Sequence, residues 1–68
     1  MKIVAICDSW EMCTSLRLAG IDSIKVLAEE FPAVFNEAVN DSETIIILVS
    51  KIFNGLYKKQ NLPLIMEI

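Results

Sequence analysis

Leu16-Arg17-Leu18-Ala19-Gly20-Ile21 has the pattern of a helix end, and the elements on both sides follow from it. Apolar residues lead into Gly20, which can take the left-handed conformation after a last helical turn, and Ile21 can then fold back on that turn. Arg17 lies in the last turn, where its positive charge faces the negative end of the helix dipole. We therefore predict that the first helix stops here and that the second strand follows.

The residues before this stop form a strand and a helix. Residues 2–7 contain a short, continuous apolar run rich in β-branched residues, which predicts a central strand buried on both faces. Asp8 offers a capping oxygen and Glu11 follows three residues later, the spacing of a capping box. We therefore expect a helix from about Ser9 to Ala19.

The residues after the stop predict an edge strand, a helix and a second buried strand. Residues 23–28 alternate, with Ile24, Val26 and Ala28 on one face, and a charged side chain on the other face is typical of an edge strand. Phe31-Pro32 begins a helix with a 3.6-residue apolar period, because proline is tolerated in the first helical turn. Asn40-Asp41-Ser42 ends this helix. Residues 44–49 repeat the pattern of the first strand.

The last third of the chain predicts a helix and an edge strand. Ser50 can cap a third helix, whose apolar stripe contains Ile52, Phe53, Leu56 and Tyr57. Gly55 lies inside this helix and costs up to ~1 kcal/mol relative to alanine. Leu62-Pro63 closes a turn, and residues 64–68 form the last strand.

Alternating strands and helices predict an α/β fold with a four-stranded parallel sheet in the order 2-1-3-4. Right-handed crossovers put the first helix on one face and the second and third helices on the other, giving three layers, α/β/α, with receiver-like (Rossmann-like) topology. The first helix covers only strands one and two. The apolar side chains of strands three and four on that face are therefore left without a partner.

Composition excludes several classes of function. The 68 residues suffice for one domain, and the sequence has no histidine and only two cysteines, which argues against a metal site, and no motif for another cofactor. A net charge of −3 with scattered basic residues makes nucleic acid a poor partner. No apolar run reaches the ~20 residues of a membrane helix, so we expect a cytoplasmic protein that does not enter the membrane. The hydrophobic content of 54% predicts apolar surface left over for a partner.

The default ligand site of this fold is the crevice at the carboxyl ends of strands one and three. The residues placed there are Asp8, Ser9, Trp10, Ser50 and Lys51. Nucleotide binding needs glycines after strand one, and the loop contains none. A phospho-accepting receiver domain needs an aspartate after strand three, where the sequence has Val49-Ser50-Lys51.

Cys7 is the one candidate nucleophile, since a thiol between a strand and a helix N-terminus can have a lowered pKa. The arginine that low-molecular-weight tyrosine phosphatases need six residues later is replaced by Cys13. Phosphotransferase-system IIB phosphocarriers are more similar, because Thr14-Ser15-Leu16 resembles their helix entry. The acidic side chains and the bulky Trp10 of this loop oppose a phosphoryl dianion. A phosphocarrier using Cys7 is therefore the alternative function, and a buried structural thiol is the favoured interpretation.

Three segments together resemble the F subunit of the archaeal-type and vacuolar-type (A/V-type) rotary ATPases. They are the opening strand followed by Asp8, the helix end Arg17 to Ile21, and the strand Ile45 to Val49 with the later Leu62-Pro63-Leu64-Ile65-Met66-Glu67-Ile68. Ser15-Leu16 depart from the Gly-Phe that the family favours before the arginine. The resemblance implies that residues 1–68 correspond to the N-terminal sheet domain of that subunit, without the C-terminal segment of the family.

The resemblance implies a non-catalytic part of the central rotor stalk that helps couple ATP synthesis or hydrolysis to proton or sodium transport. The implied partners are the coiled-coil axle subunit and the catalytic head, and the implied location is the cytoplasmic side of a membrane-bound complex. The residues expected to contact other subunits are Arg17, Leu18, Gly20, Ile21 and Trp10. From the uncovered half of the sheet we also expect the isolated domain to form a homodimer.

Overall fold

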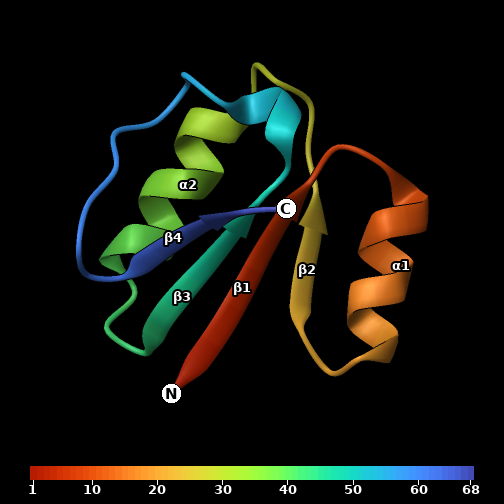
Figure 1. Cartoon of the computed structure of the whole chain (residues 1–68), viewed down its shortest axis with the longest axis horizontal. Coiled ribbons are helices and arrows are strands. Elements are labelled where there is room, and N and C mark those ends of the chain that lie inside the picture. The colour runs from red at the N-terminus through yellow and green to blue at the C-terminus, as the bar shows by residue number, and fades with distance from the viewer.

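All four strands lie in one parallel sheet in the order β2-β1-β3-β4, and the computed structural model describes residues 1–68 (Figure 1). The strands are β1 (Lys2–Cys7), β2 (Asp22–Lys25), β3 (Thr44–Val49) and β4 (Leu64–Glu67). The helices are α1 (Trp10–Leu18) and α2 (Phe31–Asn40), and a short 3₁₀ turn, η1 (Lys51–Phe53), follows β3. The predicted α/β class and strand order are confirmed.

β1 is the central strand, as its apolar run predicts. Ile6 is paired with Ile24 of β2 on one side and with Val49 of β3 on the other. Ile6 and its neighbour Cys7 are fully buried. Because parallel strands covered on both faces are apolar at nearly every position, the apolar run from Ile3 to Cys7 follows from the place of β1 in the sheet.

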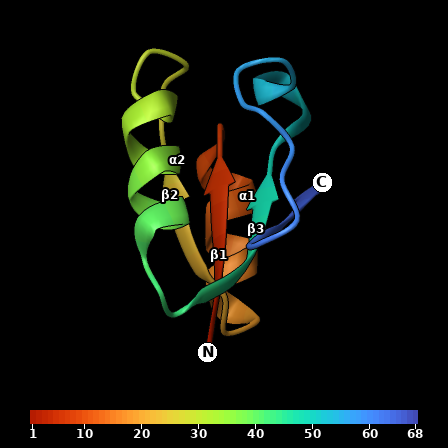
Figure 2. The ribbon, with the colours of Figure 1, turned by 90° about the vertical axis from the view of Figure 1, so that its left-hand side faces the viewer.

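The sheet separates two apolar clusters, so the fold has three layers (Figure 2). On one face, α2 and η1 contribute stacked aromatic rings, with the centroids of Phe31 and Phe53 4.6 Å apart. On the other face, α1 packs its buried Cys13 against Ala5 and Cys7 of β1. The larger rings lie on the α2 side, and the α1 side has a small core.

Both ends of α1 are defined by hydrogen bonds. The predicted cap at Asp8 is wrong: Ser9 caps the helix, and its Oγ accepts a hydrogen bond of 3.2 Å from the N–H of Met12. The loop after β1 has one more residue than the capping box requires, which moves the start of the helix to Trp10. The C-terminal prediction is confirmed: Gly20 has a φ of +89°, and the Ile21 N–H donates to the Leu16 carbonyl at 3.0 Å.

The predicted third helix is wrong, because only the η1 turn forms. Gly55 has a φ of +92°, which ends any helical path two residues after η1. Phe53 and Tyr57 of the predicted stripe still pack into the aromatic cluster on the α2 side. Ile52 and Leu56 are exposed instead, because without a helix they do not share a face with the two rings.

β2 is shorter than the predicted residues 23–28. It ends at Lys25, and the Leu27 N–H donates to the Glu30 Oε1 at 2.8 Å in the turn that leads to α2. Of the three side chains predicted to share one face, Ile24, Val26 and Ala28, only Val26 reaches the core, while Ile24 is 43% exposed and Ala28 is exposed. The edge position of the strand is confirmed.

Candidate functional site

Both serine hydroxyls in the crevice at the carboxyl ends of β1 and β3 are already used in internal hydrogen bonds. Ser9 is occupied as the helix cap, and Ser50 is buried, with its Oγ donating to the sulfur of Met12 at 3.4 Å. Trp10 is 64% exposed, and the Nζ of Lys25 lies 5.7 Å from the centre of the indole ring. The side chains that sequence reasoning placed here therefore serve the fold or face solvent.

Cys7 lies at this edge without the properties of a nucleophile. Its thiol is fully buried between β1 and α1, next to Cys13. Burial raises the pKa of Cys7, and Cys13 and Asp8 raise it further, while a hydrogen bond with Ser50 lowers it. A raised pKa reduces the thiolate fraction at neutral pH, which is the opposite of what a phosphocysteine enzyme needs. The geometry therefore favours the structural thiol over the phosphocarrier.

Three of the five expected contact residues, Arg17, Gly20 and Ile21, line one surface cavity, whereas Trp10 and Leu18 lie outside it. Trp10 begins α1, whereas Leu18 ends it and is 85% exposed. At about 1.5 Å per residue these two positions lie ~12 Å apart along the helix. Gly20 faces open space, and Ile21 is half-buried against the α1-side core. Any shared contact surface thus spans the length of α1.

Arg17 has a specific partner that the sequence did not indicate. Its Nε and Nη2 both donate to the carbonyl oxygen of Ser23, at 3.1 and 2.9 Å. Ser23 lies in the outer edge strand β2, which pairs only with β1. The guanidinium thus connects the last turn of α1 to the free edge of the sheet.

Two surface cavities are present, and both lie away from Cys7. The larger, of about 640 Å³, lies at the amino ends of the strands between β2 and α2, and the ion pair of Lys2 with Asp41 forms part of its wall. The buried Oγ1 of Thr44 in that wall has no hydrogen-bond partner. The smaller cavity, of about 520 Å³, lies between α2 and Tyr57. The charged side chains that line the larger cavity are Lys2, Arg17, Asp22, Glu37 and Asp41.

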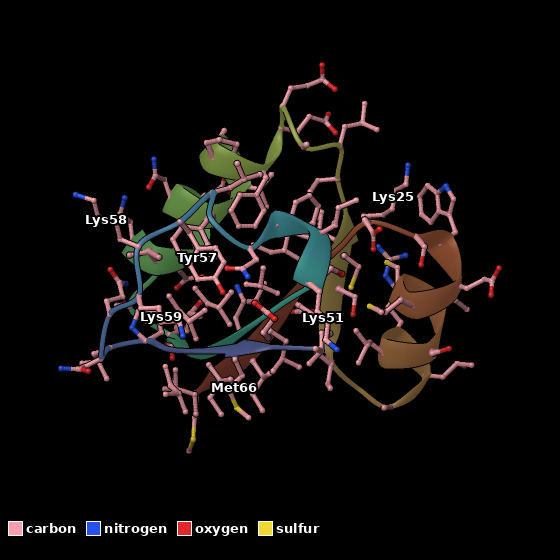
Figure 3. The ribbon with its side chains drawn as sticks, turned by 45° about the horizontal axis from the view of Figure 1, so that its top comes forward. Lys25, Lys51, Tyr57, Lys58, Lys59 and Met66 are labelled. Atoms are coloured by element: carbon pink, nitrogen blue, oxygen red, sulfur yellow. The ribbon has the colours of Figure 1, made fainter.

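An uncovered apolar surface lies on the α1 side of β1, β3 and β4. Strand register places its side chains in two rows, because Ile46 pairs with both Ile3 and Leu64, and Leu48 pairs with Met66. We call these five residues the open half-face. Figure 3 shows Met66 projecting from β4 on the side opposite Tyr57, which belongs to the α2-side core.

The exposure of the open half-face was predicted from topology, although its residues were not among the expected contact residues. Ile3 exposes 38% of its surface, Leu64 49% and Met66 48%, while Ile46 and Leu48 are half-buried. The signal that could have identified them is strand alternation, since positions i and i+2 share a face. The structure adds Ile3 of β1 to the predicted strands three and four.

The remaining features limit the chemistry of the chain. No group of three or more metal-binding side chains comes together in the structure. None of the helices has the length and hydropathy that crossing a bilayer requires. The fold and its surfaces therefore define the class: a small parallel α/β domain that presents apolar side chains on part of one sheet face.

The family model of the ATP synthase (F/14-kDa) subunit matches residues 3–68. The chain belongs to this family, which comprises the F subunits of V/A-type ATP synthases, as the resemblance predicted. A comparison with curated proteins gives no match. Family membership makes the chain a component of a multisubunit ATPase complex.

Proposed function

We propose that the chain is a non-catalytic component of the central rotor stalk of a V/A-type ATP synthase or ATPase. In this role it binds the coiled-coil axle subunit and helps couple ATP synthesis or hydrolysis in the head to proton or sodium transport. Residues 1–68 correspond to the N-terminal sheet domain of the stalk component, on the cytoplasmic side of the membrane. The family match over residues 3–68 is the observation that carries this proposal.

Two features of the structure support a binding role over a catalytic one. The open half-face leaves Leu64 and Met66 about half exposed, and contact with another protein removes such apolar surface from water. The one candidate nucleophile, Cys7, is buried and has a raised pKa. A stalk component needs a rigid body with apolar contact surfaces, and it needs no reactive group.

Purification of the native complex through an affinity tag tests the proposal. The tag belongs at the N-terminus, because Met1 is 91% exposed, whereas the C-terminus directly follows β4 and its exposed apolar side chains. We expect the axle subunit and the catalytic head subunits to co-purify with the tagged chain. Capture of the tagged chain without the axle subunit contradicts the proposal.

The alternative function needs a separate measurement. Incubation of the chain with a phosphorylated phosphotransferase donor, followed by mass spectrometry, detects a phosphocysteine at Cys7. We expect the unmodified mass for the wild-type chain. A phosphorylated wild-type chain together with an unmodified Cys7→Ser variant supports the phosphocarrier instead.

A further inference from the structure

We infer that the larger cavity, between β2 and α2, binds a lysine or arginine side chain of the coiled-coil axle subunit. The identity of the partner rests on the rotor-stalk proposal, and the chemistry of the occupant rests on the cavity itself. Such a side chain combines an apolar stem with a positively charged head, and the cavity offers a surface to each part.

The cavity exists because α2 leaves the edge strand β2 partly uncovered. α2 packs on β1 and β3, and Figure 1 shows β2 on the other side of β1. Asp22 and Ile24 of β2 face the α2 side, because their register partners Val4 and Ile6 belong to the α2-side core. Ile24 consequently keeps 43% of its surface exposed. The floor of the cavity thus lies at the edge of the sheet opposite β4.

One face of α2 forms the wall of the cavity. Val34, Glu37 and Ala38, together with the C-cap residue Asp41, recur at the three- and four-residue spacing of a single helical face, and all line the cavity. Val34 and Ala38 meet Ile24 of the floor, which gives the methylene stem of a basic side chain an apolar surface. The volume of about 640 Å³ lies within the range of roughly 300–1,000 Å³ that is usual for ligand pockets.

Two carboxylates of the cavity are free to pair with an incoming cation. Neither Asp22 nor Glu37 forms an ion pair. Lys2 is already paired with Asp41 at 2.8 Å, and a backbone carbonyl accepts two hydrogen bonds from the guanidinium of Arg17. Carboxylates outnumber cations among the charged lining residues, so the cavity favours a positively charged occupant over a negatively charged one.

The lining of the cavity also contains an unsatisfied polar group. Thr44 is 6% exposed, and its buried Oγ1 has no hydrogen-bond partner. Buried polar atoms in folded proteins nearly always have a partner, so this hydroxyl indicates a group that the isolated chain lacks. The ammonium of lysine and the guanidinium of arginine carry several N–H donors and no acceptor. Either head can donate to the hydroxyl oxygen as well as to a carboxylate.

The segment that closes α1 forms another part of the lining. Arg17, Gly20 and Ile21 line the cavity, and all three are among the residues expected to contact other subunits. Nothing lies within 4 Å of a Cβ built on Gly20, so the chain itself leaves this part of the rim open. Expected subunit contacts and free carboxylates therefore border the same cavity, which supports a side chain of a protein partner as the occupant.

Isothermal titration calorimetry of the untagged chain with the purified axle subunit tests the inference. We expect Asp22→Asn and Glu37→Gln each to raise the dissociation constant about threefold or more, because each removes one charge at nearly constant shape. The double variant should raise it about tenfold or more. The double variant should also weaken the dependence of the dissociation constant on salt concentration, since fewer charges then pair across the interface. Circular dichroism shows whether the variants remain folded.

Glu29→Gln is the matched control for these variants. Glu29 is exposed in the turn between β2 and α2, lies outside the cavity and forms no ion pair. The control removes the same charge from the chain, and we expect it to leave the dissociation constant within about twofold of wild type. Equal weakening by Glu29→Gln and Glu37→Gln attributes the effect to net charge and overturns the inference.

Three further outcomes contradict a basic side chain in the cavity. Wild-type affinity in both cavity variants overturns the inference and leaves the rotor-stalk proposal intact, because the axle then binds elsewhere on the chain. Tighter binding by Asp22→Asn or Glu37→Gln assigns an acidic group of the axle to the cavity and also overturns the inference alone. A wild-type chain that does not bind the axle overturns both proposals.

Discussion

Arg17 of α1 donates two hydrogen bonds to the carbonyl oxygen of Ser23 in β2, from Nε at 3.1 Å and from Nη2 at 2.9 Å. The residues between them contain the helix stop at Gly20, so the turn brings the guanidinium back over the strand that it precedes. An edge strand exposes backbone carbonyls that can pair with another chain. Arg17 thus both closes the first α–β connection and occupies one of these groups.

Replacing Arg17 with methionine should lower the free energy of unfolding by about 1 kcal/mol. The methionine keeps an apolar stem but removes both donors, and a net hydrogen bond of this kind is worth about that much. Urea denaturation monitored by circular dichroism gives the measurement. Lys58→Met, in the exposed segment after η1, removes one positive charge elsewhere and serves as the control. Equal losses for both variants contradict a specific role for the Ser23 contact.

Gly20→Ala should lower stability by roughly 1 kcal/mol, because it forces a Cβ into a left-handed backbone conformation. Nothing lies within 4 Å of a Cβ at this position, so the cost comes from the φ of +89° and not from a clash. Gly20→Asn should recover part of the loss, since asparagine tolerates this conformation better. A melting temperature unchanged by Gly20→Ala shows that the cap is not maintained in solution.

Cys7→Ser should retain complex formation while lowering the free energy of unfolding by about 1–2 kcal/mol, because it buries a hydroxyl in an apolar site. Burial also raises the pKa of the wild-type thiol. Alkylation of Cys7 by iodoacetamide should therefore be slow in the folded chain and rapid in urea. Rapid labelling of the folded wild-type chain contradicts the buried, protonated thiol.

The ion pair between Lys2 and Asp41, with a separation of 2.8 Å, should make stability depend on pH at both extremes. The hydrogen bond from Lys2 lowers the pKa of Asp41, so its stabilising contribution is complete above the unfolded value of about 4 and is lost as pH falls through the lower folded value. The same bond raises the pKa of Lys2, so that contribution is complete below about pH 10 and is lost as pH rises through the higher folded value.

Lys2→Met should flatten the dependence of the urea midpoint on pH below about pH 4 and above about pH 10. Part of the acid dependence should remain, because Asp41 also accepts a hydrogen bond from the Glu43 N–H. Between about pH 5 and 9 the slope should not change, since both groups are charged in the folded and unfolded chains. Lys59→Met is the control. If both variants change the pH dependence of the urea midpoint equally, the ion pair of Lys2 with Asp41 is not the cause of that dependence.

The sheet could be predicted from the sequence because its strands differ in burial. β1 and β3 are apolar at nearly every position, which only a central place in a parallel sheet explains. The stop at Gly20 was equally clear, because a glycine between a periodic helix and an apolar residue has few other uses. These signals are local, and tertiary packing agrees with them.

The third helix could not be predicted correctly because its stripe has two competing explanations. Phe53 and Tyr57 are four residues apart, which suits a helix, but the rings of Phe31 and Phe35 on α2 also attract them. Gly55 between them takes a positive φ, and the aromatic packing is satisfied without a helix. Here the tertiary packing of the aromatic rings overrides the helical spacing of the apolar residues in the sequence.

The candidate site was predicted less well, because the fold class directs attention to the carboxyl ends of the strands. Ser9 and Ser50 use their hydroxyls in internal hydrogen bonds there, which no spacing in the sequence reveals. The open half-face, by contrast, follows from handedness and strand order alone. Its extension to Ile3 depends on how far α1 reaches along β1, which requires the three-dimensional structure.

The contact between Arg17 and Ser23 also limits how many molecules can join through their sheets. A fibre grows only when every molecule accepts a strand at both edges, so that each addition leaves a new receptive end. In this chain β2 already has its Ser23 carbonyl occupied, and β4 is the edge left open. Addition of a second molecule at β4 therefore leaves a β2 edge at each end, with its Ser23 carbonyl already occupied. Arg17 thus removes one of the acceptors that a further strand would need at that edge.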